Sequence, residues 1–143
     1  MTQENKELLL KDLCARLQYG IKVFIINEVN IEKDVVLSLS NIPYIQMINK
    51  GYIKECKPYL FPLSSMTEEM IEELNAYGFF KYRDTITNVS HLISNNGINE
   101  EIYTYIDIEC VLFLIEFFNS HHIDYRGLIE KGLAIDATGL NVY

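Results

Sequence analysis

The spacing of apolar residues changes at Gly20, and this change constrains the fold more than any other feature of the sequence. Before Gly20, apolar side chains recur every three or four residues, as on one face of an amphipathic helix: Leu9, Leu10, Leu13, Cys14 and Leu17. Acidic residues lie in the first turns of this segment and basic residues lie later, which suits the helix macrodipole. We therefore predict a helix over residues 4–18 that ends at Gly20.

After Gly20, the sequence indicates short strands rich in β-branched residues. The runs lie at residues 21–26, 35–40, 44–48 and 52–56. Asn49-Lys50-Gly51 forms a turn between the last two, and Pro43 is expected at a strand start or edge. Such runs predict a small antiparallel β-meander, which either closes into an SH3-like barrel or lies as a sheet against the first helix.

The rest of the chain is predicted to be mainly helical. Pro58 and Pro62 bracket an apolar connection that leaves the sheet. A helix over residues 67–77 follows, with Ser65 or Thr67 as its N-cap and Gly78 at its end. Residues 106–118 are apolar almost all round, which predicts a buried core helix.

Three shorter segments give weaker signals. Residues 79–104 fit a short helix followed by a turn. Residues 124–131 suggest a turn into a short helix that Gly132 ends, and residues 134–143 form a tail that can dock as a strand. The chain of 143 residues therefore predicts one α+β domain, with the helix and β-meander in residues 1–62 and the helical part in residues 63–143.

The cysteines and the hydropathy indicate a cellular setting. Cys14, Cys56 and Cys110 are odd in number, widely spaced and without a C-x-x-C pair, so we expect buried free thiols. The most apolar stretch, residues 110–115, is far shorter than the ~20 residues of a membrane span. With no signal peptide in the first residues, we expect a cytoplasmic protein that does not associate with membranes.

Charge is unevenly distributed along the chain. Residues 1–57 hold eight basic and seven acidic side chains, whereas residues 58–143 hold four and thirteen, which together give the net charge of −8. Because nucleic-acid affinity depends on phosphate neutralisation, direct nucleic-acid binding is disfavoured. Weak binding through an N-terminal barrel remains an alternative, and an acidic surface can instead meet a basic protein surface.

The candidate catalytic residues lie in one short cluster. His121, His122, Asp124 and Arg126 place imidazole, carboxylate and guanidinium groups within six residues, and His122 has the residue type of a general base. Neighbouring helical residues point ~100° apart, so His121 and His122 are not expected to chelate one metal. A third ligand would have to come from far along the chain, from His91 or Asp136. Helix-end histidines and a carbonyl-capping arginine explain the cluster more simply. We therefore expect no metal and no cofactor.

Four glutamates form the candidate interaction surface: Glu68, Glu69, Glu72 and Glu73. Their spacing places them on adjacent ridges at the start of the helix predicted at 67–77. Such a face can hold a divalent ion or contact a basic partner, while a solvated helix start is its ordinary explanation.

Three stretches together carry a resemblance to a known family. They are KELLLKDLCARL followed by YG (residues 6–20), KPYLFPLSSMTEE (57–69) and HIDYRGLIEKGLA (122–134), and they cover about a third of the chain. The set resembles a family of small uncharacterised proteins encoded by phages, prophages and mobile elements of gut bacteria. The resemblance implies a source and a setting but transfers no activity and no site residue.

These observations favour a small accessory protein that acts by binding another protein of the host or phage. No phosphate-binding, dinucleotide-binding, zinc-protease, EF-hand or nucleophile-elbow motif is present, so we do not expect an enzyme. A metal-binding or hydrolytic enzyme built on His121, His122, Asp124 and Arg126 is the alternative. The oligomeric state is not specified by the sequence.

Overall fold

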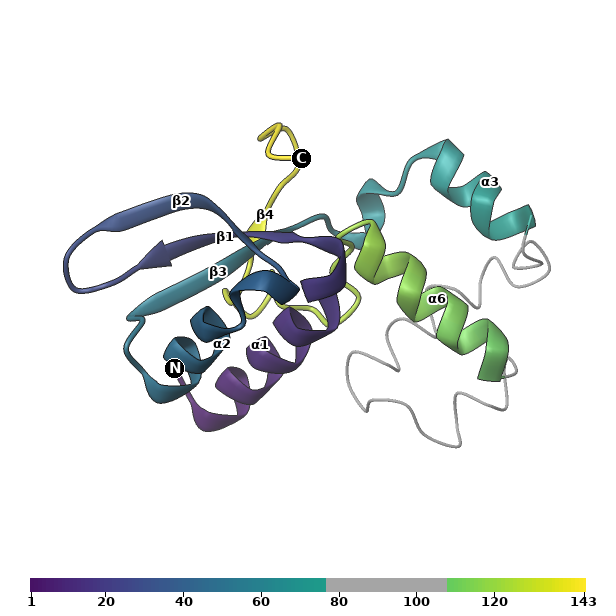
Figure 1. Ribbon diagram of the computed structural model, residues 1–143. Helices are drawn as coiled ribbons and strands as arrows, with labels where there is room; N and C mark the ends of the chain where they lie inside the picture. Colours follow the sequence, from purple (N-terminus) through teal and green to yellow (C-terminus); the bar gives the residue numbers. More distant parts are fainter. Residues whose placement is uncertain (77–107) are drawn as a thin grey trace. The chain divides into compact units, whose positions relative to one another are not determined.

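The computed structural model describes residues 1–76 and 108–143, and the chain divides into two compact units. Unit 1 comprises Met1–Leu60 and Leu128–Tyr143, and unit 2 comprises Phe61–Gly127. Helices and a mixed sheet are both present, with an N-terminal helix followed by strands, so the α+β class is confirmed (Figure 1). That the whole chain is one domain stays a prediction.

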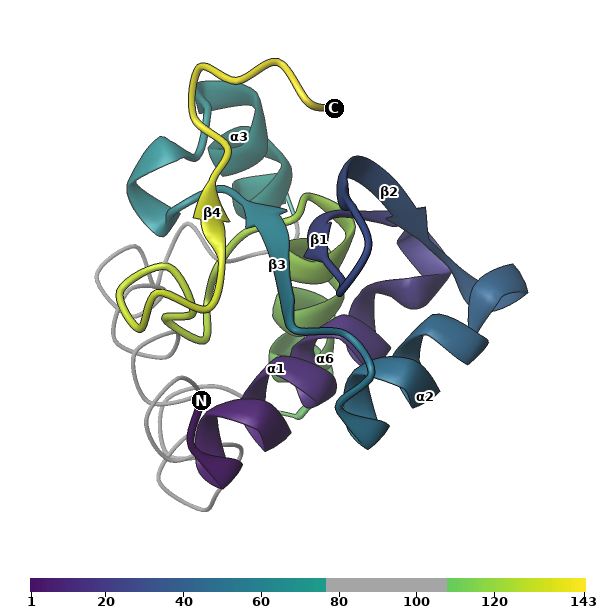
Figure 2. The same cartoon turned by 90° about the vertical axis from the view of Figure 1, so that its left-hand side faces the viewer.

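Unit 1 is a sheet with two helices on one of its faces (Figure 1). The sheet has the strand order β2-β1-β3-β4, and its strands are β1 (Ile21–Ile26), β2 (Ile31–Leu37), β3 (Glu55–Leu60) and β4 (Ile135–Asp136). β1 is antiparallel to β2 and to β3, whereas β4 runs parallel to β3 (Figure 2). The described strands therefore form an open sheet in which β1 lies between β2 and β3, and not a closed barrel or a simple meander.

The first helix confirms the prediction at the N-terminus. Helix α1 (Gln3–Arg16) begins at Thr2, whose hydroxyl accepts a hydrogen bond from the Asn5 amide, and a 3-10 turn (Leu17–Tyr19) leads to Gly20. Its buried face is rotated from the expected one, because Asp12 and Arg16 are buried while Cys14 is exposed. The expectation of a buried thiol is therefore wrong for Cys14 and correct for Cys56, and the Cys110 side chain lies outside the described residues.

The strand predicted at residues 44–48 is wrong, because this segment is helix α2 (Pro43–Lys50). A 3-10 turn (Leu39–Asn41) precedes it, with a capping box between Ser38 and Asn41. Pro43 lies in the first helical turn, where its missing N–H costs nothing. Gly51 ends the helix with a φ of 78° and donates its amide to the Ile48 carbonyl, so the turn expected at residues 49–51 is a helix C-cap.

The other strands are displaced from their predicted bounds. β1 lies where it is predicted, but β2 begins four residues before the expected run, and β3 begins three residues after its predicted start. β3 contains Pro58, Tyr59 and Leu60, so the expected connection that leaves the sheet there is wrong. Pro58 is tolerated between two strands because β4 pairs with β3 only from Tyr59 onward.

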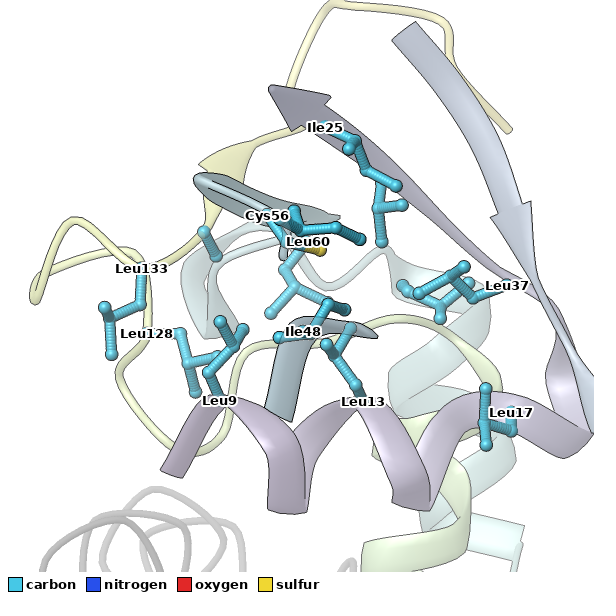
Figure 3. Packing of buried hydrophobic residues seen from close by; sticks show 14 residues of the cluster. Leu9, Leu13, Leu17, Ile25, Leu37, Ile48, Cys56, Leu60, Leu128 and Leu133 are labelled. Atoms are coloured by element: carbon cyan, nitrogen blue, oxygen red, sulfur yellow. The ribbon is translucent and has the colours of Figure 1, made fainter. Parts of the chain in front are cut away.

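The core of unit 1 lies between the sheet and the two helices. Leu9, Leu13 and Leu17 face it from α1 and the turn that follows, and Ile48 faces it from α2 (Figure 3). Ile25, Leu37, Cys56 and Leu60 contribute from the strands, and Leu128 and Leu133 from the returning C-terminal segment. That segment consists of turns up to β4, so the short helix expected at residues 124–131 is wrong, whereas the tail does contribute a strand.

Unit 2 contains two described helices. Helix α3 (Glu68–Ala76) begins at Thr67, whose hydroxyl accepts the Met70 amide, which selects Thr67 over Ser65 as the cap. A 3-10 turn (Leu63–Ser65) precedes α3. Helix α6 (Ile108–Ser120) buries Val111, Leu114, Phe117 and Phe118 in a core shared with Leu74, Ile123 and Tyr125. The core helix is therefore present, although Leu112 is 55% exposed, so α6 is not buried all round.

Two expectations lie outside the described residues: the short helix and turn within 79–104, and the role of Gly78 in ending α3. In the described part of the chain, no helix has the length and apolar character needed to span a membrane.

Candidate functional site

The C-terminal end of α6 arranges the residues that the sequence singles out as catalytic candidates. His122 has a φ of 57° and donates its amide to the Asn119 carbonyl, while the Ile123 amide bonds to the Phe118 carbonyl. These two bonds form a Schellman motif with histidine in the left-handed position that glycine usually fills. The chain then reverses and pairs with Phe61, which accepts the Asp124 amide through its carbonyl and donates its own amide to the His122 carbonyl.

His121 faces α3 and is half-buried. Its ring stacks on Phe117 at 4.2 Å, and its Nδ1 lies 3.0 Å from the Phe117 carbonyl oxygen. Because a carbonyl oxygen only accepts, this contact requires the proton on Nδ1. The other nitrogen, Nε2, lies 3.7 Å from Glu73 Oε2 and forms an ion pair with it only when the ring is protonated.

The other members of the cluster have different surroundings from His121. His122 and Asp124 are buried, and the Arg126 guanidinium lies 4.4 Å from the centre of the Tyr125 ring. The Tyr125 ring in turn stacks on Phe118 at 5.4 Å. The cluster is therefore a helix terminus whose aromatic and cationic side chains pack against one another.

The structure does not assemble these residues into a metal centre. Among the described residues, no three histidine, cysteine, aspartate or glutamate side chains gather closely enough to hold an ion. Asp136, the described candidate for a further ligand, belongs to unit 1, where Thr138 hydrogen-bonds its carboxylate and lowers its pKa. The other candidate, His91, lies outside the described residues.

The four predicted interaction glutamates all lie exposed on α3, and we call Glu68, Glu69, Glu72 and Glu73 the acidic ridge. Glu73 contacts His121, whereas the other three form no ion pair within the part of the chain that the structure describes. The ridge therefore presents carboxylates to solvent at the N-terminal end of the helix, where its dipole stabilises them.

Exposed apolar side chains concentrate in a different place, which sequence reasoning missed. Of the eleven large apolar side chains that are exposed among the described residues, seven lie between residues 29 and 52, and we call this the exposed apolar segment. Its members are Val29, Ile31, Val36, Leu39, Ile42, Met47 and Tyr52. They lie on β2 at the sheet edge, on the β1–β2 turn, and on and around α2.

Sequence reasoning also missed a buried ion pair within α1. Arg16 Nε lies 2.8 Å from Asp12 Oδ2, Arg16 Nη2 lies 3.0 Å from Asp12 Oδ1, and both side chains are fully buried. The signal was present in the sequence, because opposite charges four residues apart flank the Leu9–Leu13–Leu17 stripe.

Elsewhere in unit 1, burial raises the pKa of the Cys56 thiol to about 12, so this thiol is not a nucleophile at neutral pH.

A third feature of unit 1 involves the C-terminal tail. The Tyr143 hydroxyl accepts a hydrogen bond from the Lys22 amide at 3.1 Å and donates one to the Tyr59 carbonyl at 2.9 Å. Burial raises the pKa of Tyr143, so the hydroxyl stays protonated and able to donate at neutral pH. The sequence carries no local signal for this contact, since its partners lie far away along the chain.

Comparison of the chain with models of protein families, with curated proteins and with solved structures gives no match.

Proposed function

We propose that this chain is a small accessory protein, of phage or mobile-element origin, that acts by binding another protein. The observation that carries the proposal is the exposed apolar segment, part of which we infer to form one surface patch. Contiguous exposed apolar surface is typical of protein-binding sites, whereas single exposed apolar residues are ordinary. Association would remove this surface from water, which is the main favourable contribution to most protein interfaces.

The acidic ridge adds an electrostatic contribution to the proposal. Exposed carboxylates without ion-pair partners attract a basic surface and accelerate the encounter with it. They repel nucleic acid for the same reason, so a protein partner with a basic surface fits better than DNA or RNA. A basic nucleic-acid site on a host enzyme has this chemistry and is one partner that the ridge would suit.

The alternatives receive less support from the geometry. Nucleic-acid binding through an N-terminal barrel required a strand at residues 44–48, which is helix α2. Hydrolysis at the His121–Arg126 cluster requires a substrate to reach the general base His122 and the Asp124 carboxylate, and both side chains are buried.

The test is affinity capture of the tagged chain from a lysate of its source cell, with and without nuclease. Two variants separate the two surfaces: Leu39→Ser with Met47→Ser in the exposed apolar segment, and glutamine at all four positions of the acidic ridge. We expect a stoichiometric protein partner that survives nuclease, is lost with the first variant and is captured more weakly at physiological salt with the second.

A matched control changes four other exposed glutamates to glutamine: Glu4, Glu28, Glu116 and Glu130. This control alters the net charge by the same amount without touching α3. The proposal would be contradicted if both surface variants captured the partner as well as the wild type does. It would also be contradicted if capture required nucleic acid. Capture that the control weakens as much as the ridge variant would show that net charge, not the ridge, attracts the partner.

A further inference from the structure

The ladder between β1 and β3 ends at Val23 and Pro58, and a side chain bridges the two strands at the next position. The two strands pair from Ile26 opposite Glu55 to Val23 opposite Pro58. The next position in this register would place Lys22 opposite Tyr59. There the Tyr143 hydroxyl stands between the strands and bonds to the Lys22 amide and the Tyr59 carbonyl. We call these two backbone groups the ladder gap.

The position of Pro58 explains why the gap offers a donor and an acceptor. Antiparallel residue pairs alternate between those that exchange hydrogen bonds and those that do not. Pro58 has no N–H, so its pairing with Val23 suits a position without hydrogen bonds. The following position is then one at which the strands would exchange bonds, and the hydroxyl supplies the missing donor and acceptor together.

One lysine adds two further contacts to the same segment. Lys22 Nζ donates a hydrogen bond to the Val142 carbonyl and lies 5.7 Å from the centre of the Tyr143 ring. The site therefore contacts a backbone carbonyl, an aromatic ring and a hydroxyl in two consecutive residues. Tyr143 is 43% exposed as a whole, and both of its hydrogen bonds to the strands are made by its hydroxyl.

We propose that the ladder gap is a binding site for a tyrosine-bearing peptide segment of a partner protein, and that residues 142–143 occupy it in cis. The required chemistry is a backbone carbonyl followed by a tyrosine hydroxyl, as in Val142-Tyr143. The inference rests on the proposed protein-binding function and adds a second site with a defined ligand.

Two observations favour a partner protein over a second copy of this chain. A second copy would offer the same contacts as the resident tail, and the resident tail has the advantage of an effective concentration of about millimolar. A partner can offer more, because Val36 of the exposed apolar segment lies opposite Lys22 on β2, with its side chain on the same face. Val36 is still 47% exposed with residues 142–143 in place, so a segment that covers Val36 and inserts a tyrosine gains apolar burial.

The experiment measures binding of a capped peptide with the sequence of residues 140–143, acetyl-Leu-Asn-Val-Tyr-amide, to the full chain. The control peptide ends in phenylalanine and lacks only the hydroxyl. We expect Tyr143→Ala to bind the tyrosine peptide about tenfold more tightly than it binds the control, as the loss of a bridging hydroxyl predicts. Wild-type protein should bind it about tenfold more weakly than the variant, since its own tail competes.

Equal binding of the two peptides by Tyr143→Ala, or no binding of either, would overturn the inference. A second variant keeps the test valid if Tyr143→Ala does not fold. Tyr143→Phe retains the ring, and we expect faster hydrogen exchange at the Lys22 amide and at no amide of α2. Unchanged exchange at Lys22 would show that the hydroxyl does not hold the gap.

Two other results separate this inference from its alternatives. A wild-type dimer that Tyr143→Ala abolishes would identify a second copy as the occupant and overturn the choice of a partner protein. If neither peptide binds, but capture of a partner is lost when Leu39 and Met47 are changed, the ladder-gap site is refuted and the proposed function stands. Peptide binding without any captured partner would instead contradict the proposed function.

Discussion

Replacing Asp12 by asparagine should destabilise the protein by about 3–5 kcal/mol, which is the typical effect of removing one partner from a buried ion pair. The substitution preserves the shape of the side chain and removes only its charge. Arg16 then remains charged and fully buried and loses the charge of the Asp12 carboxylate. Since whole domains are typically stable by 5–15 kcal/mol, this loss would be a large share of the total.

The geometry supports this magnitude independently. The pair has two N–H···O contacts, at 2.8 and 3.0 Å, and hydrogen bonds to charged groups contribute about 1.5–3 kcal/mol each. Replacing both residues by apolar ones, Asp12→Leu with Arg16→Met, removes both charges and should recover most of the loss. Urea unfolding followed by circular dichroism measures all three free energies.

The sheet offers a matched control at the same distance. Lys57 Nζ lies 2.8 Å from Glu55 Oε1, but these side chains are 32% and 38% exposed. Lys57→Met should therefore cost less than about 1 kcal/mol, because water screens and solvates the pair. If Asp12→Asn cost no more than Lys57→Met, or if the double variant were as unstable as Asp12→Asn, burial of the charge would not be the cause.

Three smaller predictions concern single groups. Alkylation at mildly alkaline pH should modify Cys14 well before Cys56, as peptide mass spectrometry would show, because Cys14 is exposed and burial raises the pKa of Cys56 to about 12. Burial also raises the pKa of Tyr143, so the folded state holds the proton of its hydroxyl more tightly than the unfolded state does. The free energy of unfolding should therefore fall as pH rises above ~10, the ordinary pKa of tyrosine. This fall should be smaller in Tyr143→Phe, as a comparison of urea midpoints would show. Gly51→Ala should cost about 1 kcal/mol in the same assay, because Gly51 has a φ of 78° and an added Cβ would meet nothing within 4 Å.

The segments that could be predicted from the sequence are those with local signals. α1 follows from its apolar stripe and from Gly20, and α3 from Thr67 and the glutamates that follow it. β1 is a run rich in β-branched residues that ends at polar residues, and α6 is too long and too apolar for a strand. In each case the length and the terminal residues select the same structure as the apolar pattern.

α2 shows why one such pattern misleads. Tyr44-Ile45-Gln46-Met47-Ile48 alternates imperfectly, and alternation alone suggested a strand. Its ends indicate a helix: Pro43 fits the first turn and Gly51 fits the left-handed C-cap. Between them, Tyr44, Ile45 and Ile48 have helical spacing and face the core of unit 1. Terminal residues were therefore more informative here than the apolar period, because only eight residues separate them.

Sheet order and the tail contact depend on residues far apart in the sequence. β4 pairs with β3 across a separation that includes all of unit 2, and Tyr143 reaches Lys22 across almost the whole chain. No local propensity encodes such pairings, because the paired residues lie far apart in the sequence. The one visible trace is Pro58, which shows that β3 has a position without a backbone donor.

Neighbouring residues of the candidate site occupy different surroundings in the folded chain. His121 and His122 are adjacent, yet the left-handed backbone at His122 reverses the chain between them. His121 is left half-buried against Phe117 with Nε2 toward Glu73, whereas His122 and Asp124 are buried in unit 2. Polar groups that do converge come from separate segments, as Lys22, Tyr59 and Tyr143 do, or from successive helical turns, as Asp12 and Arg16 do. His121 contacts a backbone carbonyl of its own helix end, as expected of a helix-end histidine, while a catalytic role for the cluster stays a prediction. Binding at the sheet is the better subject for experiment.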